Sequence, residues 1–134
     1  MLMTRASEYA LLSLIVIAKR SDPIDSDTLS KQLDISKSFL AKVLQSLARA
    51  GILNSFKGVN GGFSLAKKGE EISVLEIITA VENKTPAVFD CAPSKENCPS
   101  DMASVCSIWP FINKLQGKID DFLASLTLKE ILEA

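Results

Sequence analysis

Three cysteines are the residues of this chain best suited to chemistry. Cys91, Cys98 and Cys106 are separated by six and then seven residues, and the sequence holds no further cysteine and no histidine. Thiolates bind iron and zinc, and they can also be oxidised reversibly. Zinc sites usually join four protein ligands in closely spaced pairs such as C-x2-C, which this stretch lacks. Iron–sulfur clusters also take four ligands as a rule, of which these thiolates could supply three.

Other roles for the three thiols stay open. They could form a zinc site, act as a redox switch without a metal, or have no present role. Asp90 and Asp101 flank the cysteines and could supply carboxylate ligands. The spacing does not choose between a 2Fe–2S and a 4Fe–4S cluster.

The opening of the chain indicates a cytoplasmic protein. An apolar run of about ten residues ends at Lys19 and Arg20, which is too short to cross a bilayer of about 30 Å. No small-residue cleavage site follows, so we expect neither a signal peptide nor contact with a membrane. Cytoplasmic thiols are kept reduced, which weakens a structural disulfide and leaves metal binding or redox sensing.

Composition and charge narrow the class of function. The 134 residues are 47% hydrophobic, enough for one sizeable core or for a small domain with an oligomerisation element. Residues 1–68 hold ten Lys and Arg against five Asp and Glu, a net +5, whereas residues 69–134 hold five against eleven, a net −6. A basic half hints at nucleic acid, although a solvated surface is the commoner cause. The lack of a histidine and of a nucleophile–base pair argues against an enzyme.

The basic half is predicted to form three helices and then a hairpin. The predicted helices cover 6–19, a short stretch that starts after Asp25 or Ser26, and 37–50. Pro23 ends the first helix, Ser36 is well placed to cap the third, and Gly51 stands where a finished helix needs a left-handed residue. Three helices with a tight second turn indicate a helix-turn-helix.

One face of the third helix is predicted to carry polar donors. Lys42, Gln45 and Arg49 lie within about 40° of Ser38 on a helical wheel, opposite an apolar face. Such a row suits phosphate oxygens and base edges, whereas a solvated helix face is the ordinary alternative.

The hairpin that follows favours DNA. Two strand-like runs, 52–56 and 63–65, are joined by a glycine-rich tip beside Lys57. A phosphate-binding loop would open into a helix instead, so nucleotide binding is not expected. The arrangement is that of a winged helix-turn-helix, whose wing can reach a phosphate or the minor groove.

The acidic half is predicted to hold a short helix capped by Ser73 and a long helix from about Trp109. Apolar residues recur at alternating steps of three and four, which is the seam of a coiled coil. The seam residues are Val105, Ile108, Ile112, Leu115, Ile119, Phe122 and Leu126. So long a seam in a short chain favours a partner helix, and hence a homodimer whose symmetry would match a palindromic operator.

The chain resembles the IscR/NsrR-type winged-helix regulators of the Rrf family. The resemblance rests on "MLMTRASEYALLSL", the helix "ISKSFLAKVLQSLARAGIL", the wing "SFKGVNGGFSLAK", the segment "ISVLEIITAVE" and the three-cysteine loop followed by Trp109. It covers nearly the whole chain and implies a dimeric bacterial transcription factor that binds a double-stranded DNA operator.

The resemblance also implies roles for single residues. Ser38 and Lys42 match operator-reading positions, and Lys57 matches a basic wing residue. The full predicted DNA-binding set is Ser36, Ser38, Lys42, Gln45, Arg49 and Lys57. Many family members hold an iron–sulfur cluster on three cysteines plus either a histidine or an acidic residue of the partner's first helix, and Glu8 matches that acidic position.

The predicted fold is mainly α with a small β-hairpin wing. Residues 1–68 would form a winged helix-turn-helix DNA-binding domain, and residues 69–134 a cysteine-bearing sensor loop with a dimerisation helix. The predicted function is transcriptional regulation controlled by a cluster or by thiol redox state. A cluster-free redox regulator that docks on a metabolic enzyme is the alternative. A small iron–sulfur electron-transfer protein is less expected, because it would need neither the polar row nor the wing.

Overall fold

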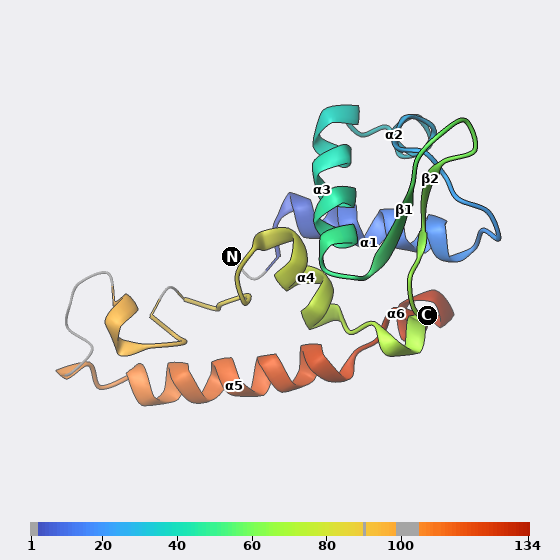
Figure 1. Cartoon of the computed structure of the whole chain (residues 1–134). Helices are drawn as coiled ribbons and strands as arrows, with labels where there is room; N and C mark the ends of the chain where they lie inside the picture. The colour runs from blue at the N-terminus through green and yellow to red at the C-terminus, as the bar shows by residue number, and fades with distance from the viewer. Residues whose placement is uncertain (1–2, 90, 99–104) are drawn as a thin grey trace.

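The computed structural model describes residues 3–89, 91–98 and 105–134 and is mainly helical, with one small hairpin in the described part (Figure 1). This is the predicted fold class. In chain order the elements are α1 (Arg5–Ala18), α2 (Ser26–Leu33), α3 (Lys37–Arg49), β1 (Leu53–Phe56), β2 (Gly62–Leu65), the 3-10 turn η1 (Gly69–Glu71), α4 (Val74–Glu82), the 3-10 turn η2 (Lys95–Asn97), α5 (Trp109–Ser125) and α6 (Leu128–Glu133).

A tight connection between α2 and α3 forms the helix-turn-helix. Asp34 follows α2 with a left-handed backbone (φ 56°), which turns the chain back at once. The Ile35 amide then donates to the Ser30 carbonyl over 3.0 Å. α3 begins after Ser36, and Gly51 beyond its end has the left-handed φ of 80° that the sequence predicts.

The wing is an antiparallel hairpin fastened to the helix-turn-helix. Its register pairs Phe56 with Gly62 at the tip end. Ile24, just before α2, exchanges two backbone hydrogen bonds with Phe63 (3.1 and 2.8 Å). A Cβ at Gly62 would lie 2.4 Å from the Ile24 backbone, so only glycine permits this approach. The wing is therefore held in place by the chain that leads into α2.

The main apolar core lies between α1, α3, the wing and α4. Its fully buried members include Leu14, Leu29, Leu40, Leu44, Leu47, Ile52, Ile72, Ile77 and Leu128. Residues from both sides of Lys68 contribute, because α4 packs on α1 and α3, and α6 returns to η1 and α1. The division into two domains at Lys68 stays a prediction.

The long helix α5 runs beneath α4, and its first half projects away from the winged-helix part (Figure 1). It begins at Trp109, as predicted, with Pro110 in its first turn, where a missing N–H costs nothing. Leu123 is buried against α4, and Ile119 of the predicted seam packs with it. Part of the seam is therefore covered within the chain. The expectation of a partner helix stays a prediction, and it applies most directly to the seam residues that one chain leaves exposed.

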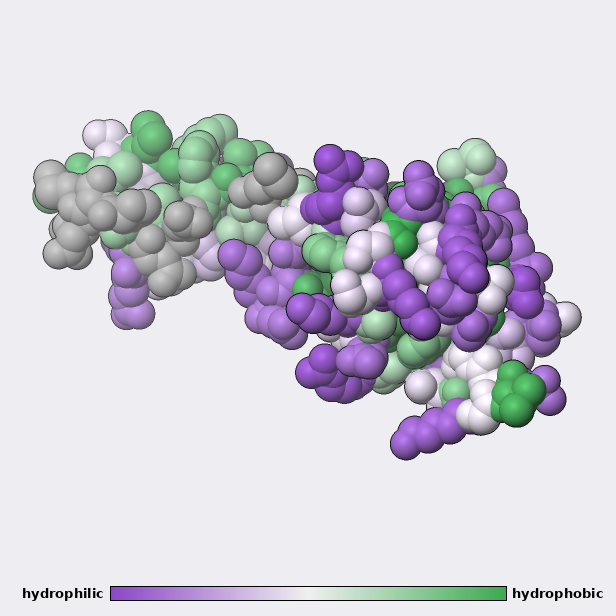
Figure 2. Space-filling model, turned by 90° about the horizontal axis from the view of Figure 1, so that it is seen from above, coloured by the Kyte–Doolittle hydropathy of each residue, from purple (hydrophilic) through white to green (hydrophobic). Residues whose placement is uncertain are grey.

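Other seam residues face outward. Val105, Ile108 and Phe122 are exposed, and Phe111, which the seam did not include, is exposed beside them. A repeat of three and four residues marks an apolar stripe on a helix, and such a stripe can pack both on another helix of the same chain and on a partner chain. The pattern therefore could not tell which of the two covers each residue. Figure 2 shows hydrophobic residues gathered on the projecting arm, whereas hydrophilic residues cover most of the winged-helix part seen from above. Of the helices that the structure describes, none combines the length and the apolar character that a membrane span requires.

Candidate nucleic-acid interface and cysteine segment

The outer face of α3 presents the predicted row of donors. Ser38, Lys42, Gln45 and Arg49 are all exposed. The opposite face is buried in the core through Leu40, Val43, Leu44 and Leu47. Burial of that face fixes the helix about its own axis, so the donor row points away from the protein, where a duplex could meet it. The structure therefore brings the four residues together.

Two cations of this row are available for a ligand. Lys37, at the start of the same helix, pairs with Asp27 over 3.7 Å. By contrast, no carboxylate of the described residues lies within ion-pair distance of Lys42, Arg49 or Lys57. Cations without an internal partner suit a polyanion, because binding the phosphates does not first break an ion pair within the protein.

Ser36 occupies the predicted N-cap position of α3, but its hydroxyl does not cap a backbone amide. It lies 3.1 Å from the hydroxyl of Ser38 instead. Both hydroxyls are on the exposed side and each can rotate to donate outward. The pair thus extends the donor row to the start of the helix.

The wing adds a basic residue at its tip. Lys57 is exposed directly after β1, and Val59 at the turn is fully exposed, at 103% of its reference area. Lys67, which follows β2, pairs with Glu76 of α4 over 2.5 Å. It therefore serves to attach the wing strand to α4, and Lys57 is the better candidate for a phosphate contact.

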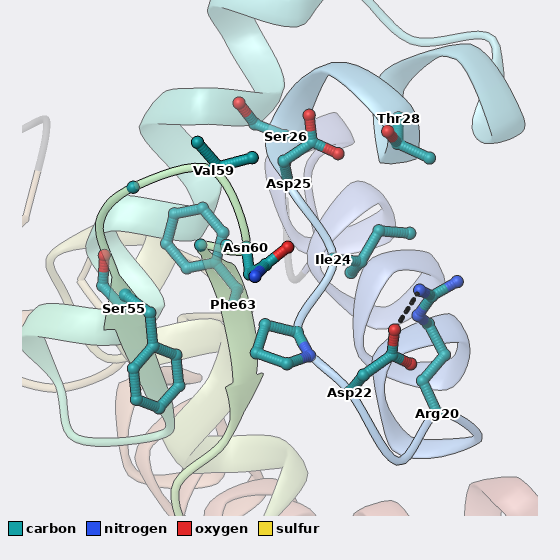
Figure 3. A pocket seen from close by; sticks show the side chains of 15 residues that line it. Arg20, Asp22, Ile24, Asp25, Ser26, Thr28, Ser55, Val59, Asn60 and Phe63 are labelled. Carbon is teal, nitrogen blue, oxygen red and sulfur yellow. Dashed lines mark hydrogen bonds and ion pairs between the residues drawn. The ribbon is translucent and has the colours of Figure 1, made fainter.

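An open hollow of about 790 Å³ lies between the wing and the loop before α2 (Figure 3). Asp22 and Asp25 line it, and Arg20 at its edge pairs with Asp22 over 3.1 Å. Hydrogen bonding from the Thr28 side chain holds the pKa of the Asp25 carboxyl below its ordinary value. With Asp22 paired to Arg20, the Asp25 carboxylate makes this side of the wing less favourable for phosphate. Lys57 does not line this hollow.

The three cysteines are half-buried and form no disulfide. Cys91 lies between α4 and η2, Cys98 follows η2, and Cys106 precedes α5. Within residues 3–89, 91–98 and 105–134, no three Cys, Asp or Glu side chains lie close enough together to hold a metal ion. The flanking carboxylates Asp90 and Asp101 fall outside those ranges. One chain, as described, does not gather a complete ligand set.

A row of polar side chains on α5 binds the segment that carries Cys91. The hydrogen bonds run from Trp109 to the Cys91 carbonyl, from Asn113 to the Ala92 carbonyl and from Gln116 to the Pro86 carbonyl, each 2.8 Å long. The donors lie 18 to 30 residues from their acceptors in the sequence, so local patterns could not pair them. Their spacing of four and three residues places the three donors on one face of α5, but the helix also carries charged residues such as Lys114 and Lys118, so the pattern alone did not single them out.

Glu8 is exposed on the first turn of α1 and pairs with Arg5 over 3.5 Å. Its helix is anchored at this end, because the hydroxyls of Thr4 and Ser7 both bond to the carboxylate of Glu82 at the end of α4. Glu8 does not join the cysteines in any ligand group of the described chain. Its predicted ligand role would need a second subunit.

Comparison with known proteins fits this geometry. The Rrf2 family, described as iron-dependent transcriptional regulators, matches residues 3–134. The HTH-type transcriptional regulator IscR of Serratia proteamaculans is 30% identical over 135 residues, which span 98% of this chain and 79% of that protein.

Solved structures show the same fold. The oxidized form of Staphylococcus aureus CymR matches with a TM-score of 0.73 and 23% identity, over 100% of this chain and 98% of that one. The T. potens IscR structure matches with a TM-score of 0.70 and 22% identity, over 98% and 85%. The match to the family model over residues 3–134, together with the winged helix and its exposed donor row, shows that this chain belongs to the Rrf2 family of transcriptional regulators.

Proposed function

We propose that the protein is a cytoplasmic, homodimeric regulator whose affinity for operator DNA depends on the chemical state of Cys91, Cys98 and Cys106. The observation that carries the proposal is the attachment of the Cys91 segment to α5 by the Trp109 and Asn113 side chains. A change at the Cys91 thiol would therefore act on a segment whose backbone is bonded to α5.

DNA contact is assigned to α3 and the wing. With α3 in the major groove, Arg49 and Lys42 have the donors for guanine edges or phosphates, and Gln45 has the amide that suits adenine. Ser36 and Ser38 lie at the start of the helix, where hydroxyls reach phosphate oxygens. The exposed Lys57 would contact a phosphate beside the groove.

A second copy of the chain is assigned to α5. Phe111 and Phe122 are 65% and 60% exposed, and Ile108 is exposed on the same side of the helix. We call these three residues the apolar strip. A row of large exposed apolar side chains is typical of an interface rather than of a monomer surface. A symmetric dimer through this strip supplies the two α3 helices that a palindromic operator needs.

The cysteines are assigned to an iron–sulfur cluster, 2Fe–2S or 4Fe–4S. Three thiolates are the donors that such clusters take, and a fourth ligand is needed. We assign the fourth position to Glu8 of the other subunit, because Glu8 is exposed and belongs to an anchored helix. A bound cluster would supply a centre sensitive to oxidants and to competing ligands.

Iron and acid-labile sulfide analysis of anaerobically purified protein tests the assignment. We expect iron and sulfide in equal amounts with visible absorbance, and loss of that absorbance when any one of Cys91, Cys98 or Cys106 is replaced by alanine. Zinc without iron would show that the cysteines form a zinc site. Metal-free protein whose DNA binding still depends on thiol oxidation would show that they form a thiol switch.

A further inference from the structure

The polar row on α5 acts on the main chain of the cysteine segment. Trp109, Asn113 and Gln116 are spaced four and three residues apart, so they share one face of the helix. Each bonds a backbone carbonyl between residues 86 and 92 over 2.8 Å. Bonds to the backbone fix where the segment lies on α5, whatever its side chains are.

Gln116 has the most constrained position of the three. Its side chain is only 3% exposed, and its Nε2 donates to the Pro86 carbonyl and to Oδ1 of Asp120, both over 2.8 Å. Its Oε1 accepts from the Val88 amide, also over 2.8 Å. A buried amide costs free energy unless it is hydrogen-bonded, and here donors and acceptor are all used. The Gln116 amide donates to the carbonyl of Pro86 and accepts from the N–H of Val88, so both bonds form only when residues 86–88 lie in one position on α5.

The contact continues from Gln116 to the first thiol. Ala92 is fully buried, and its carbonyl is bonded by Asn113. The Trp109 indole bonds the Cys91 carbonyl, and the Lys95 ammonium lies 5.0 Å from the centre of the indole ring. Residues before Cys91 and the residue after it are thus both hydrogen-bonded to α5.

We propose that Gln116 is the positioning residue that keeps the cysteine segment docked on α5, and that this docking transmits the state of Cys91 to the helix carrying the apolar strip. The hydrogen bonds of Gln116 go to Pro86, Val88 and Asp120. Gln116 acts through the backbone of residues 86–88, and its part in transmission rests on the function proposed above.

Two variants separate the hydrogen bonds from a change of charge. Gln116→Met keeps the length of the side chain and removes its hydrogen bonds. Gln116→Glu keeps the acceptor but sets a carboxylate against two oxygens. Lys114→Gln is the control, because Lys114 is exposed on the same helix and its loss changes the net charge by the same amount as Gln116→Glu.

The first measurement is local. Trp109 is the only tryptophan of the chain, so its emission reports on the contact with the Cys91 carbonyl. In reduced, metal-free protein we expect both Gln116 variants to shift this emission to the red and to speed alkylation of Cys91 by about tenfold or more, since each lost hydrogen bond weakens docking. Lys114→Gln should leave both unchanged. An emission and an alkylation rate like those of the unaltered protein, in variants with intact circular dichroism, would overturn the positioning role.

The second measurement concerns transmission. We compare the operator dissociation constant of the iron-loaded or oxidised form with that of the reduced form. Couplings of this kind typically change the constant by about 5- to 150-fold. In both Gln116 variants we expect the two constants to differ by no more than about twofold. The reduced variants should bind DNA like the reduced unaltered protein. A difference retained in the variants would refute transmission through Gln116. The unaltered protein could instead bind the operator equally well in both forms, while the Gln116 variants still show faster alkylation of Cys91. That result would refute the proposed function and leave the positioning role supported.

Discussion

The buried Ser7 hydroxyl of α1 donates a hydrogen bond of 3.0 Å to the Glu82 carboxylate at the end of α4. Ser7 is 0% exposed, and Thr4 at the N-cap of α1 bonds to the same carboxylate oxygen. One side chain thus connects the helix that carries Glu8 with the helix that leads into the cysteine segment. Ser7 and Glu82 are 75 residues apart in sequence, so this polar contact joins two distant segments of the chain.

Glu82→Ala is expected to lower the free energy of unfolding by about 1–3 kcal/mol, because it leaves the buried Ser7 hydroxyl without its acceptor. Urea unfolding followed by circular dichroism measures this. Glu130→Ala, which removes an exposed carboxylate from α6, should change stability by less than about 0.5 kcal/mol. Equal stability of the two variants would show that Glu82 does not anchor α1.

Lys42→Ala and Arg49→Ala should each weaken operator binding without changing the fold. A base-edge contact is expected to cost about 1–3 kcal/mol and to relax specificity at one position, whereas a lost phosphate contact mainly lowers the salt dependence by about one ion. Fluorescence anisotropy with a duplex selected from a random pool, at several salt concentrations, separates the two.

Lys129→Ala is the matched control, because it removes one positive charge from α6, where Lys129 pairs with Glu70. It should bind DNA like the unaltered protein. Undiminished binding by both α3 variants would exclude this helix as the reading element.

Phe111→Asp should give a folded monomer, whereas Ile119→Asp should destabilise the chain itself. Phe111 is 65% exposed in one chain, so a charge there disturbs only a partner. Ile119 packs with Leu123 on α4, and an unpaired charge at that site costs several kcal/mol. Sedimentation at micromolar concentration together with thermal unfolding distinguishes the two results. A Phe111→Asp dimer would place the interface elsewhere.

The sequence predicted those parts of the fold that depend on local signals. Ser73 caps α4 by accepting from the Glu76 amide over 3.0 Å, and Gly51 takes its left-handed conformation, because caps and turns involve residues close in the chain. The donor row of α3 was also predictable, since the apolar residues opposite it decide which way the helix faces.

Interactions between distant segments were not predictable in this way. The seam pattern left out Leu123, which is buried against α4. Gln116 was overlooked because its partners lie 28 and 30 residues before it. Periodicity identifies an apolar face, but the covering element follows from tertiary packing.

Glu8→Ala should leave a cluster that forms but is lost faster on exposure to oxygen or nitric oxide, because a weak oxygen ligand can be replaced by water or a small thiol. Decay of the visible absorbance in air measures the effect. Arg5→Ala is a useful comparison, since it removes the ion pair of Glu8 and leaves the carboxylate in place. A decay rate that is the same in Glu8→Ala and in the unaltered protein would rule out Glu8 as a ligand.

Operator affinity as a function of cysteine state tests the central claim most directly. The unaltered protein would be titrated with the selected duplex in its anaerobic iron-loaded form, its reduced metal-free form and its alkylated form, with the triple variant Cys91→Ala, Cys98→Ala and Cys106→Ala beside it. We expect dissociation constants of the unaltered protein that differ by about 5- to 150-fold among the forms, and one constant for the triple variant under all conditions. Equal affinity of the unaltered protein in all three forms would contradict regulation through these thiols.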